Sequence, residues 1–236
     1  MSWWSRQTVE KMATEFQAGS TRILYDADCL TAVSLEWVQP EFWRLRAAVL
    51  AELGGRGQAL AVDTGDGQAV LRRYLRGGWA ARLSRDRYLF TGYGRCRPFR
   101  EWRILARLHA TGLPVPRPLM ASCERSGLSY QGALVTSRIA DALPLSQLLA
   151  VLTQADWEEL AVTLMRFFGA GLVHPDLNPG NVLRDEGGRW YLIDFDRARI
   201  GRGPVRPDRM LARLERALAR SPHYRAGLLP GLLSRA

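Results

Sequence analysis

In the last third of the chain, two short apolar runs carry polar side chains at their ends. This stretch begins with His174-Pro175-Asp176-Leu177-Asn178-Pro179-Gly180-Asn181 and continues into Val182-Leu183. After a Gly187-Gly188 turn it resumes as Trp190-Tyr191-Leu192-Ile193-Asp194-Phe195-Asp196. Two apolar strands around a glycine turn predict a β-hairpin. Such a hairpin would bring the side chains of Asn181 and Asp194 to one face of a cleft, and Asp176 lies five residues before Asn181.

These three side chains fit the requirements of phosphoryl transfer from ATP. That reaction needs one group to orient the acceptor hydroxyl and accept its proton, and oxygen ligands to hold Mg²⁺ against the phosphates. Asp176 fits the first role as catalytic base, and Asn181 and Asp194 fit the second as metal ligands. Ordinary turns are the alternative, but the order, the spacing and the flanking strands together favour a site. His174 is interpreted as a structural residue that braces the loop around Asp194.

A glycine cluster upstream is the candidate for a loop that holds the nucleotide. Gly54-Gly55-Arg56-Gly57 precedes a hairpin predicted from apolar runs at 59–63 and 68–74. Glycines let backbone amides approach phosphates, so Gly55 and Gly57 are predicted to contact the nucleotide. A plain surface loop is an equally good interpretation of the same residues.

The second strand of that hairpin ends in a cationic residue where kinase-like folds usually carry a lysine. Here the residue is Arg72, and Lys11, far upstream, is the only lysine of the chain. An arginine can neutralise phosphate charge with a planar fork of donors. Glu101, in a helix predicted from about 99 to 110, is the expected ion-pair partner of Arg72. A solvated helix charge is the alternative for Glu101.

The distribution of these elements predicts an α+β, two-lobed protein-kinase-like fold, with a β-rich N-lobe and a short helical C-lobe. Residues 1–136 are expected to form an N-terminal region and the β-rich nucleotide-binding lobe, and residues 137–236 the helical catalytic lobe. A strand is predicted at 131–139 and helices at 146–152 and 156–168. The sequence pattern assigns no role to residues 1–34.

The composition is that of a globular protein with a strong positive charge. Of the 236 residues, 47% are apolar and 24% charged, and the formal net charge is +10. Arginine-rich coding in a GC-rich genome explains that charge as well as an anionic partner does. The three cysteines are far apart, which argues against a disulfide framework or a zinc site. No signal peptide and no apolar run of about 20 residues are visible, so any membrane contact is expected to be peripheral.

Two arginine-rich segments stand out from this background. Residues 72–103 hold ten arginines interleaved with aromatic side chains, a pattern that suits either a solvated face or anionic sugars and phosphates. A second segment has arginines at helical spacing beside apolar residues, at Arg209, Arg213, Arg216 and Arg220. Such an amphipathic helix is expected to pack on its own lobe, and contact with a membrane surface is the second interpretation.

Several separated motifs resemble the lipopolysaccharide core sugar kinases. The 174–181 stretch is one of them, together with Leu192-Ile193-Asp194-Phe195-Asp196-Arg197-Ala198-Arg199. Residues 70–79 and 84–92 are similar to segments of the kinases in this family that act on 3-deoxy-D-manno-octulosonic acid (Kdo), and Gly112-Leu113-Pro114-Val115-Pro116-Arg117-Pro118 also fits. The resemblance spans roughly residues 35–205 and rests on several motifs, which makes it specific.

This resemblance implies an enzyme that uses ATP and Mg²⁺ to phosphorylate the 4-hydroxyl of a Kdo residue on a lipid A precursor. It implies that the enzyme works at the cytoplasmic face of the inner membrane, in peripheral contact with it. No protein partner is inferred from the sequence. Carried over by position, Asp176 is the catalytic base, and Asn181 and Asp194 are the metal ligands. The resemblance also implies that an arginine at the position of Arg72 is typical of this family. Asp196 stands where protein kinases carry a glycine.

Other functions remain as alternatives to this one. A heptose kinase shares the motifs and the membrane setting, whereas an aminoglycoside kinase would need an acidic site for its cationic substrate. A protein substrate is disfavoured, because the 40 residues after Asp196 leave little room for an activation segment and a large helical lobe. The alternative from another class is a non-catalytic binding module, either a pseudokinase or a basic nucleic-acid-binding protein. The presence of Asp176, Asn181 and Asp194 argues against a pseudokinase. No specific nucleic-acid motif is present.

Overall fold

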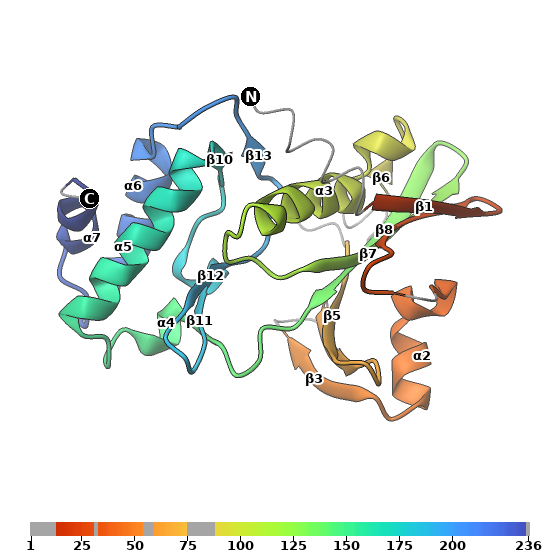
Figure 1. Cartoon of the computed structure of the whole chain (residues 1–236), viewed down its shortest axis with the longest axis horizontal. Coiled ribbons are helices and arrows are strands. Elements are labelled where there is room, and N and C mark those ends of the chain that lie inside the picture. Colours follow the sequence, from red (N-terminus) through yellow and green to blue (C-terminus); the bar gives the residue numbers. More distant parts are fainter. Residues whose placement is uncertain (1–12, 31–32, 54–58, 75–87, 235–236) are drawn as a thin grey trace. The chain divides into compact units, whose positions relative to one another are not determined.

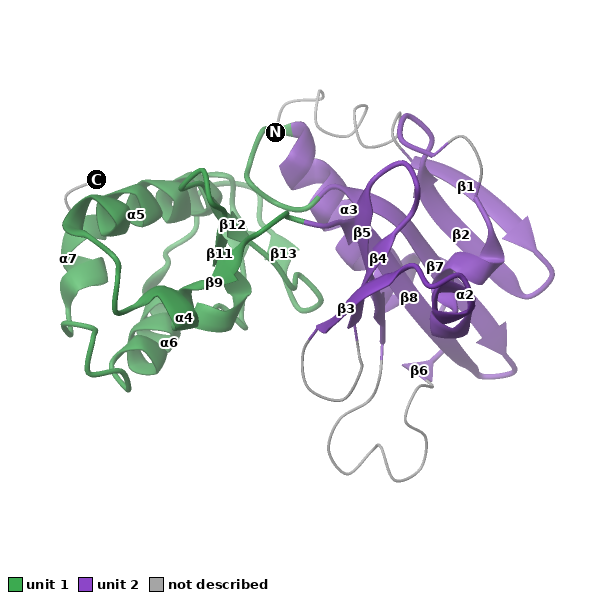
Figure 2. Cartoon of the chain, turned by 90° about the horizontal axis from the view of Figure 1, so that it is seen from below, with its two compact units in different colours: residues 1–2, 111–116, 139–236 green, residues 3–110, 117–138 purple. Residues whose placement is uncertain are grey.

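The computed structural model describes residues 13–30, 33–53, 59–74 and 88–234. The chain forms two compact units (Figure 2). The N-terminal unit comprises residues 3–110 and 117–138, and the C-terminal unit comprises residues 1–2, 111–116 and 139–236. Gly55 and Gly57 lie outside the described residues, as do residues 75–87 of the basic stretch 72–103.

The N-terminal unit is built on an eight-stranded antiparallel sheet with the order β1-β2-β7-β8-β5-β4-β3, in which the short β6 also pairs with β8 (Figure 1). The strands are β1 (Ala13–Ala18), β2 (Thr21–Asp26), β3 (Val49–Leu53), β4 (Ala59–Asp63), β5 (Gln68–Arg73), β6 (Tyr88–Leu89), β7 (Pro118–Ser126) and β8 (Ser129–Ser137). The helical elements of this unit are η1 (Leu35–Val38), α2 (Pro40–Leu45), η3 (Tyr93–Arg95) and α3 (Arg97–Ala110).

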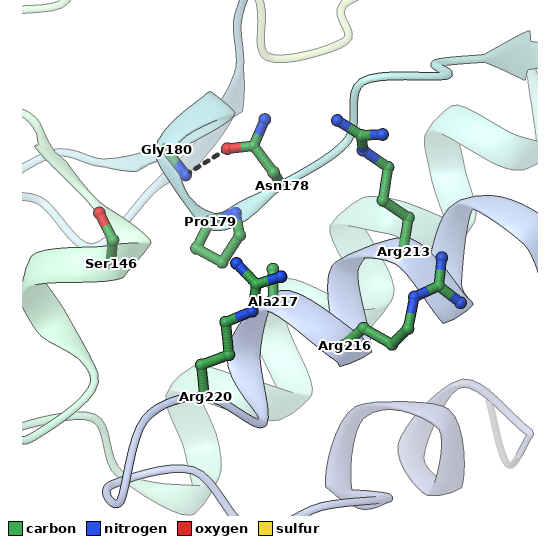
Figure 3. Close-up of a pocket in the computed structure, with 8 residues that line it drawn as sticks. All are labelled: Ser146, Asn178, Pro179, Gly180, Arg213, Arg216, Ala217 and Arg220. Carbon is green, nitrogen blue, oxygen red and sulfur yellow. Dashed lines mark hydrogen bonds between the residues drawn. The ribbon is translucent and has the colours of Figure 1, made fainter.

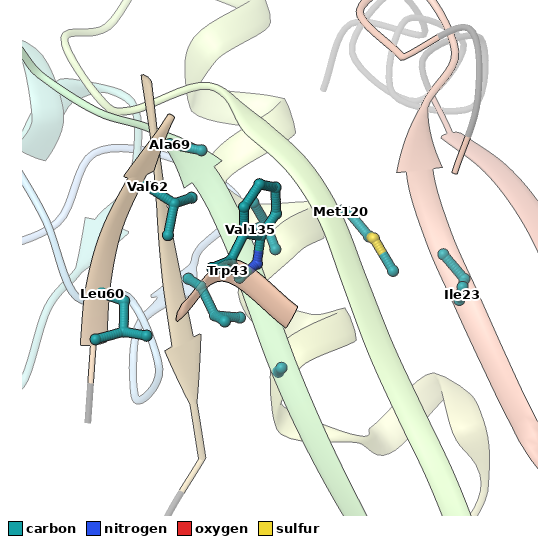
Figure 4. Packing of buried hydrophobic residues seen from close by; sticks show 9 residues of the cluster. Ile23, Trp43, Leu60, Val62, Ala69, Met120 and Val135 are labelled. Atoms are coloured by element: carbon teal, nitrogen blue, oxygen red, sulfur yellow. The ribbon is translucent and has the colours of Figure 1, made fainter. Parts of the chain in front are cut away.

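One face of this sheet packs against α2. Trp43 of α2 is buried in a cluster of side chains from the strands, and its indole Nε1 donates a hydrogen bond to the Trp37 carbonyl at 2.8 Å (Figure 4). Along β5, Ala69 and Leu71 belong to that cluster. Because side chains alternate along a strand, Arg72 must face the opposite side of the sheet. The β5 strand therefore contributes both to the core and to a polar site.

The opposite face of the sheet is covered by α3, which approaches β8 closely at Gly132. A Cβ atom on Gly132 would lie 2.7 Å from Pro98 Cγ and 2.8 Å from the backbone oxygen of Ser122. Only glycine fits between a helix and a strand at that separation. Helix α3 therefore lies close against the sheet, and its Glu101 pairs with Arg72 of β5.

The C-terminal unit combines helices with small sheets. Its elements are β9 (Leu143–Pro144), α4 (Leu145–Leu148), α5 (Gln154–Gly169), β10 (Leu172–Val173), η4 (Pro179–Asn181), β11 (Val182–Arg184), β12 (Trp190–Leu192), β13 (Arg199–Ile200), α6 (Asp208–Leu218) and α7 (Leu228–Leu233). The strands form one sheet of β12-β11-β9 and a pair of β10-β13. Helix α5 begins at a capping box between Thr153 and Asp156 and buries an apolar stripe that includes Leu160, Leu164 and Phe168.

Helix α6 packs on its own unit, as its amphipathic pattern predicted. Met210, Leu214 and Leu218 are buried, while Arg213 and Arg216 on its other side are exposed. Across the described residues, no helix is long and apolar enough to cross a membrane.

Candidate active site

The predicted β-hairpin is present and places Asn181 beside Asp194. Strands β11 and β12 are antiparallel, with Val182 opposite Leu192. The Ile193 amide then donates a hydrogen bond to the Asn181 carbonyl at 3.1 Å. Asn181 and Asp194 therefore lie at the same end of the hairpin, because Asp194 follows Ile193 directly.

The loop of residues 174–181 is held by hydrogen bonds that converge on one carbonyl group. The carbonyl oxygen of Asp176 accepts from Asn178 Nδ2 at 2.7 Å and from Asn181 Nδ2 at 3.0 Å. Asn178 Oδ1 in turn accepts from the Gly180 amide at 2.8 Å. These bonds fix the backbone that carries the Asp176 carboxylate. They also orient the Asn181 amide so that its Oδ1 remains available to a cation.

Asp194 has a backbone conformation that non-glycine residues rarely adopt. Its φ angle is +63°, in the left-handed region. Such a conformation costs on the order of 1 kcal/mol and persists where the surroundings enforce it, often at functional sites. The strain at Asp194 thus marks this position independently of the sequence motif.

His174 braces the backbone on either side of Asp194, as expected. It is buried, and its Nε2 lies 3.1 Å from the Ile193 carbonyl oxygen, so Nε2 carries the proton and donates it. The imidazole also packs against the Phe195 ring at 5.2 Å between centroids. Because Ile193 and Phe195 flank Asp194, these contacts support its strained conformation.

Two guanidinium groups lie beside the carboxylate of Asp176. Arg213 Nη2 is 3.1 Å from Oδ1, and Arg197 Nε is 3.7 Å from Oδ2. The side chain of Asp176 is 31% exposed, so solvent and a substrate can reach it. Arg213 belongs to α6, and no local pattern in the sequence linked it to Asp176.

The oxygens of Asn181 and Asp194 fit a magnesium ion that is shared with a nucleotide. Mg²⁺ prefers oxygen ligands and is commonly held by one or two protein groups together with phosphates and waters. Within the described ranges, no group of three or more His, Cys, Asp or Glu residues could hold a metal ion. Nucleotide oxygens and waters would complete the coordination that Asn181 and Asp194 begin.

The N-terminal unit contains the expected contact between Arg72 and Glu101. Arg72 forms an ion pair with Glu101 of α3, whose carboxylate also accepts a hydrogen bond from the Tyr74 hydroxyl. Glu101 is 2% exposed. Burial and the neighbouring Glu101 carboxylate raise the pKa of Tyr74 well above its ordinary value, so this hydroxyl remains a hydrogen-bond donor. The sequence predicted the ion pair but gave no sign of the contribution of Tyr74.

These features define the class of protein. An antiparallel sheet carries a cation paired with a buried glutamate of the helix on its face, and a second unit carries an Asp–Asn–Asp set at one end of a hairpin and on the loop before it. This is the α+β protein-kinase-like fold that the sequence predicted. Solved structures that match include the Rio2 kinase of Chaetomium thermophilum, at 18% identity and a TM-score of 0.49, covering 98% of this chain and 74% of that one. The PK-1 kinase of Cydia pomonella granulovirus matches at 13% identity and a TM-score of 0.46, covering 69% of this chain and 58% of that one.

Within that class, the chain belongs to the lipopolysaccharide kinase (Kdo/WaaP) family, whose model matches residues 40–227. The resemblance drawn from the motifs is thereby confirmed. A relative from Xanthomonas oryzae pv. oryzae, named 3-deoxy-D-manno-octulosonic acid kinase, is 43% identical over 211 residues, covering 89% of this chain and 84% of the relative. Relatives with the same name from Xanthomonas axonopodis pv. citri and Stenotrophomonas maltophilia are 44% and 42% identical, each covering 85% of this chain and 81% of the relative.

Proposed function

We propose that this protein is a Kdo kinase, which transfers the γ-phosphoryl group of ATP to the 4-hydroxyl of a Kdo residue on a lipid A precursor. The observation that carries the proposal is the identity of 42–44% to relatives named for that activity, over at least 85% of this chain. The site supports it, because the C-terminal unit carries a carboxylate, an amide oxygen and a second carboxylate, which are the kinds of group that phosphoryl transfer uses.

Asp176 acts as the base in this proposal. Its carboxylate orients the acceptor hydroxyl and accepts the proton as the new O–P bond forms and the bond to the leaving ADP breaks. The two amides that bind the Asp176 carbonyl hold this carboxylate in place. Arg213 and Arg197, beside the carboxylate, limit its rotation.

Asn181 and Asp194 would hold the magnesium ion that neutralises phosphate charge. In the N-terminal unit, Arg72 would contact the nucleotide phosphates while Glu101 and Tyr74 fix its guanidinium group. Gly55 and Gly57 are assigned to nucleotide binding from their sequence alone. The anionic glycolipid acceptor places the enzyme in peripheral contact with the cytoplasmic face of the inner membrane.

A radiometric assay with purified protein tests this proposal. The protein would be incubated with γ-labelled ATP, Mg²⁺ and a Kdo-bearing lipid A precursor, beside the Asp176→Ala variant and a heptose-bearing acceptor. Transfer to the Kdo acceptor by the wild type, with none by the variant, is the expected result. Label on the heptose acceptor alone would reassign the protein to the heptose kinases.

A further inference from the structure

A basic pocket opens in the C-terminal unit beside the loop that carries Asp176. Its volume is about 540 Å³, within the range of small-molecule sites. It lies between Ser146 of α4, the Asn178–Gly180 turn and an arginine-bearing face of α6 (Figure 3). Each wall therefore comes from the same compact unit as the proposed base.

The charge of this pocket is strongly positive. Arg213 and Arg216 line it from adjacent turns of α6, and Arg220 lines it from the turn that follows the end of that helix. No acidic side chain is among the described residues that line the pocket. Glu215, the acidic neighbour of Arg216, is engaged elsewhere, because it accepts hydrogen bonds from Tyr224 Oη at 2.6 Å and from the Gly227 amide at 2.5 Å.

Arg216 and Arg220 differ from Arg213 in their contacts. Arg213 contacts Asp176, whereas Arg216 and Arg220 have no carboxylate within ion-pair distance in the described part of the chain. The guanidinium groups of Arg216 and Arg220 therefore repel each other unless an anion neutralises them. Guanidinium forks match carboxylate and phosphate oxygens in bidentate geometry. The pocket is thus suited to an anionic group.

The position of the pocket indicates which substrate this group belongs to. The pocket shares Arg213 and the Asn178–Gly180 turn with the surroundings of Asp176, the residue proposed to face the acceptor hydroxyl. Neither Asn181 nor Asp194, which are proposed to face the nucleotide through a metal ion, lines it. The pocket therefore lies on the acceptor side of the reacting groups.

We propose that this pocket binds a carboxylate or phosphate group of the acceptor glycolipid, with Arg216 and Arg220 as specificity-determining residues. Arg213 links the bound anion to the carboxylate of Asp176. The inference rests on the proposed function, because a Kdo acceptor brings its own carboxylate and a lipid A precursor brings phosphates. Recognition of these anions would position the sugar hydroxyl at Asp176.

The test compares the double variant Arg216→Gln/Arg220→Gln with the wild type and with Arg225→Gln, which removes an exposed arginine outside the pocket. The acceptor is dispersed in neutral detergent, and KM is measured separately for the Kdo-bearing lipid A precursor and for ATP. We expect the acceptor KM of the double variant to rise at least about tenfold. The KM for ATP should stay within about twofold, and Arg225→Gln should behave as the wild type does. The variant Arg216→Lys/Arg220→Lys keeps the positive charge but loses the bidentate guanidinium groups. Its acceptor KM should lie between those of the wild type and of Arg216→Gln/Arg220→Gln.

Three other results would overturn the inference. An unchanged acceptor KM would remove the pocket from acceptor binding, and a rise in the KM for ATP instead would assign it to the nucleotide. Loss of binding to anionic phosphatidylglycerol vesicles, with an unchanged KM for dispersed acceptor, would assign the arginines to the membrane surface.

Direct binding of the acceptor separates this inference from the proposed function. Calorimetric titration of the lipid A precursor into wild type and double variant reports binding without turnover. If the wild type binds but does not phosphorylate the acceptor, and the double variant does not bind it, the role of the pocket is supported and the proposed kinase function is contradicted. If the wild type neither binds nor phosphorylates the acceptor, both the role of the pocket and the proposed function are contradicted.

Discussion

Arg213 Nη2 lies 3.1 Å from Oδ1 of Asp176, so that a residue of α6 contacts the carboxylate of the loop at 174–181. The two residues are distant in the sequence, and the fold of the C-terminal unit alone brings them together. Helix α6 is anchored by buried Met210, Leu214 and Leu218, which fixes the side of the helix that Arg213 occupies. The contact joins the proposed base to the basic pocket.

Loss of the Arg213 contact should reduce turnover more than it reduces stability. Arg213→Gln removes a partner that orients Asp176, and a misplaced base costs roughly 10- to 100-fold in rate. Because the Arg213 side chain is 48% exposed, the free energy of unfolding should change by less than about 1 kcal/mol. Steady-state kinetics and urea unfolding measure both quantities. Arg213→Lys should recover part of the lost kcat, and a kcat equal to that of the wild type in Arg213→Gln would show that the contact does not position the base.

Asn181 should control the requirement for magnesium. Asn181→Ala removes both an oxygen ligand and a hydrogen bond to the Asp176 carbonyl, so the Mg²⁺ concentration for half-maximal activity should rise about 10- to 100-fold. Asn178→Ala is the matched control, because it removes the other hydrogen bond to the same carbonyl without removing a proposed ligand. Its kcat should fall while its Mg²⁺ requirement stays unchanged. Equal shifts in both variants would mean that Asn181 acts through the backbone alone.

The ion pair of Arg72 with Glu101 should contribute to both folding and nucleotide binding. Arg72→Ala leaves the Glu101 charge buried with a cationic partner removed, which typically costs about 3 kcal/mol. The KM for ATP should also rise, by about tenfold if Arg72 contacts a phosphate. Arg72→Lys keeps the positive charge but lacks the planar guanidinium group, so it should recover part of the lost stability. If Arg72→Ala lowers stability while the KM for ATP does not change, Arg72 has a structural role only.

Stability should depend on pH through the cap of α5. The backbone amide of Thr153 and the nearby Arg184 hold the pKa of Asp156 below its ordinary value of 3.8. A depressed pKa means that the ionised carboxylate stabilises the folded state above pH 3.8, and that this contribution is lost as the pH falls through the folded-state pKa. Asp156→Ala should therefore cost about 1 kcal/mol at neutral pH, and its difference from the wild type should shrink below about pH 4.

Thermal unfolding between pH 3 and pH 8 measures this effect. Glu159→Ala, an exposed substitution on the same helix, provides the control and should leave the melting temperature almost unchanged. A destabilisation by Asp156→Ala that stays constant across the whole range would argue against a contribution from the ionised carboxylate.

The parts of the site that are local in the sequence could be predicted from it. A glycine turn and two apolar runs determine the β11–β12 hairpin, and the hairpin by itself brings Asn181 next to Asp194. The partnership of Arg72 with Glu101 followed from the expected fold, in which a strand cation faces the next helix. The structure adds Tyr74, because alternation along the chain does not show which hydroxyl reaches a buried carboxylate.

Long-range contacts could not be predicted in this way. The helical spacing of Arg213, Arg216 and Arg220 predicted one exposed side of a helix, but α6 ends at Leu218, so Arg220 lies in the turn after it. The loop that faces Arg213 depends on how α6 packs. The strand pair β1–β2 was also missed, although Gly19 turns the chain between the strands with a φ of +58°. Gly55 and Gly57 lie outside the described residues, so their role remains a prediction from the sequence.

Asp176 is proposed as the base of a kinase that acts on a Kdo-bearing glycolipid. The most direct measurement is transfer of label from γ-labelled ATP to a Kdo-bearing lipid A precursor by the wild type and by Asp176→Asn, with nucleotide binding measured in parallel. We predict transfer by the wild type, a loss of at least about 1,000-fold in kcat for the variant, and similar ATP affinity in both proteins. Transfer by Asp176→Asn at the rate of the wild type would contradict the assignment of the base. Binding of ATP by the wild type without any transfer to the glycolipid would contradict the assignment of the acceptor.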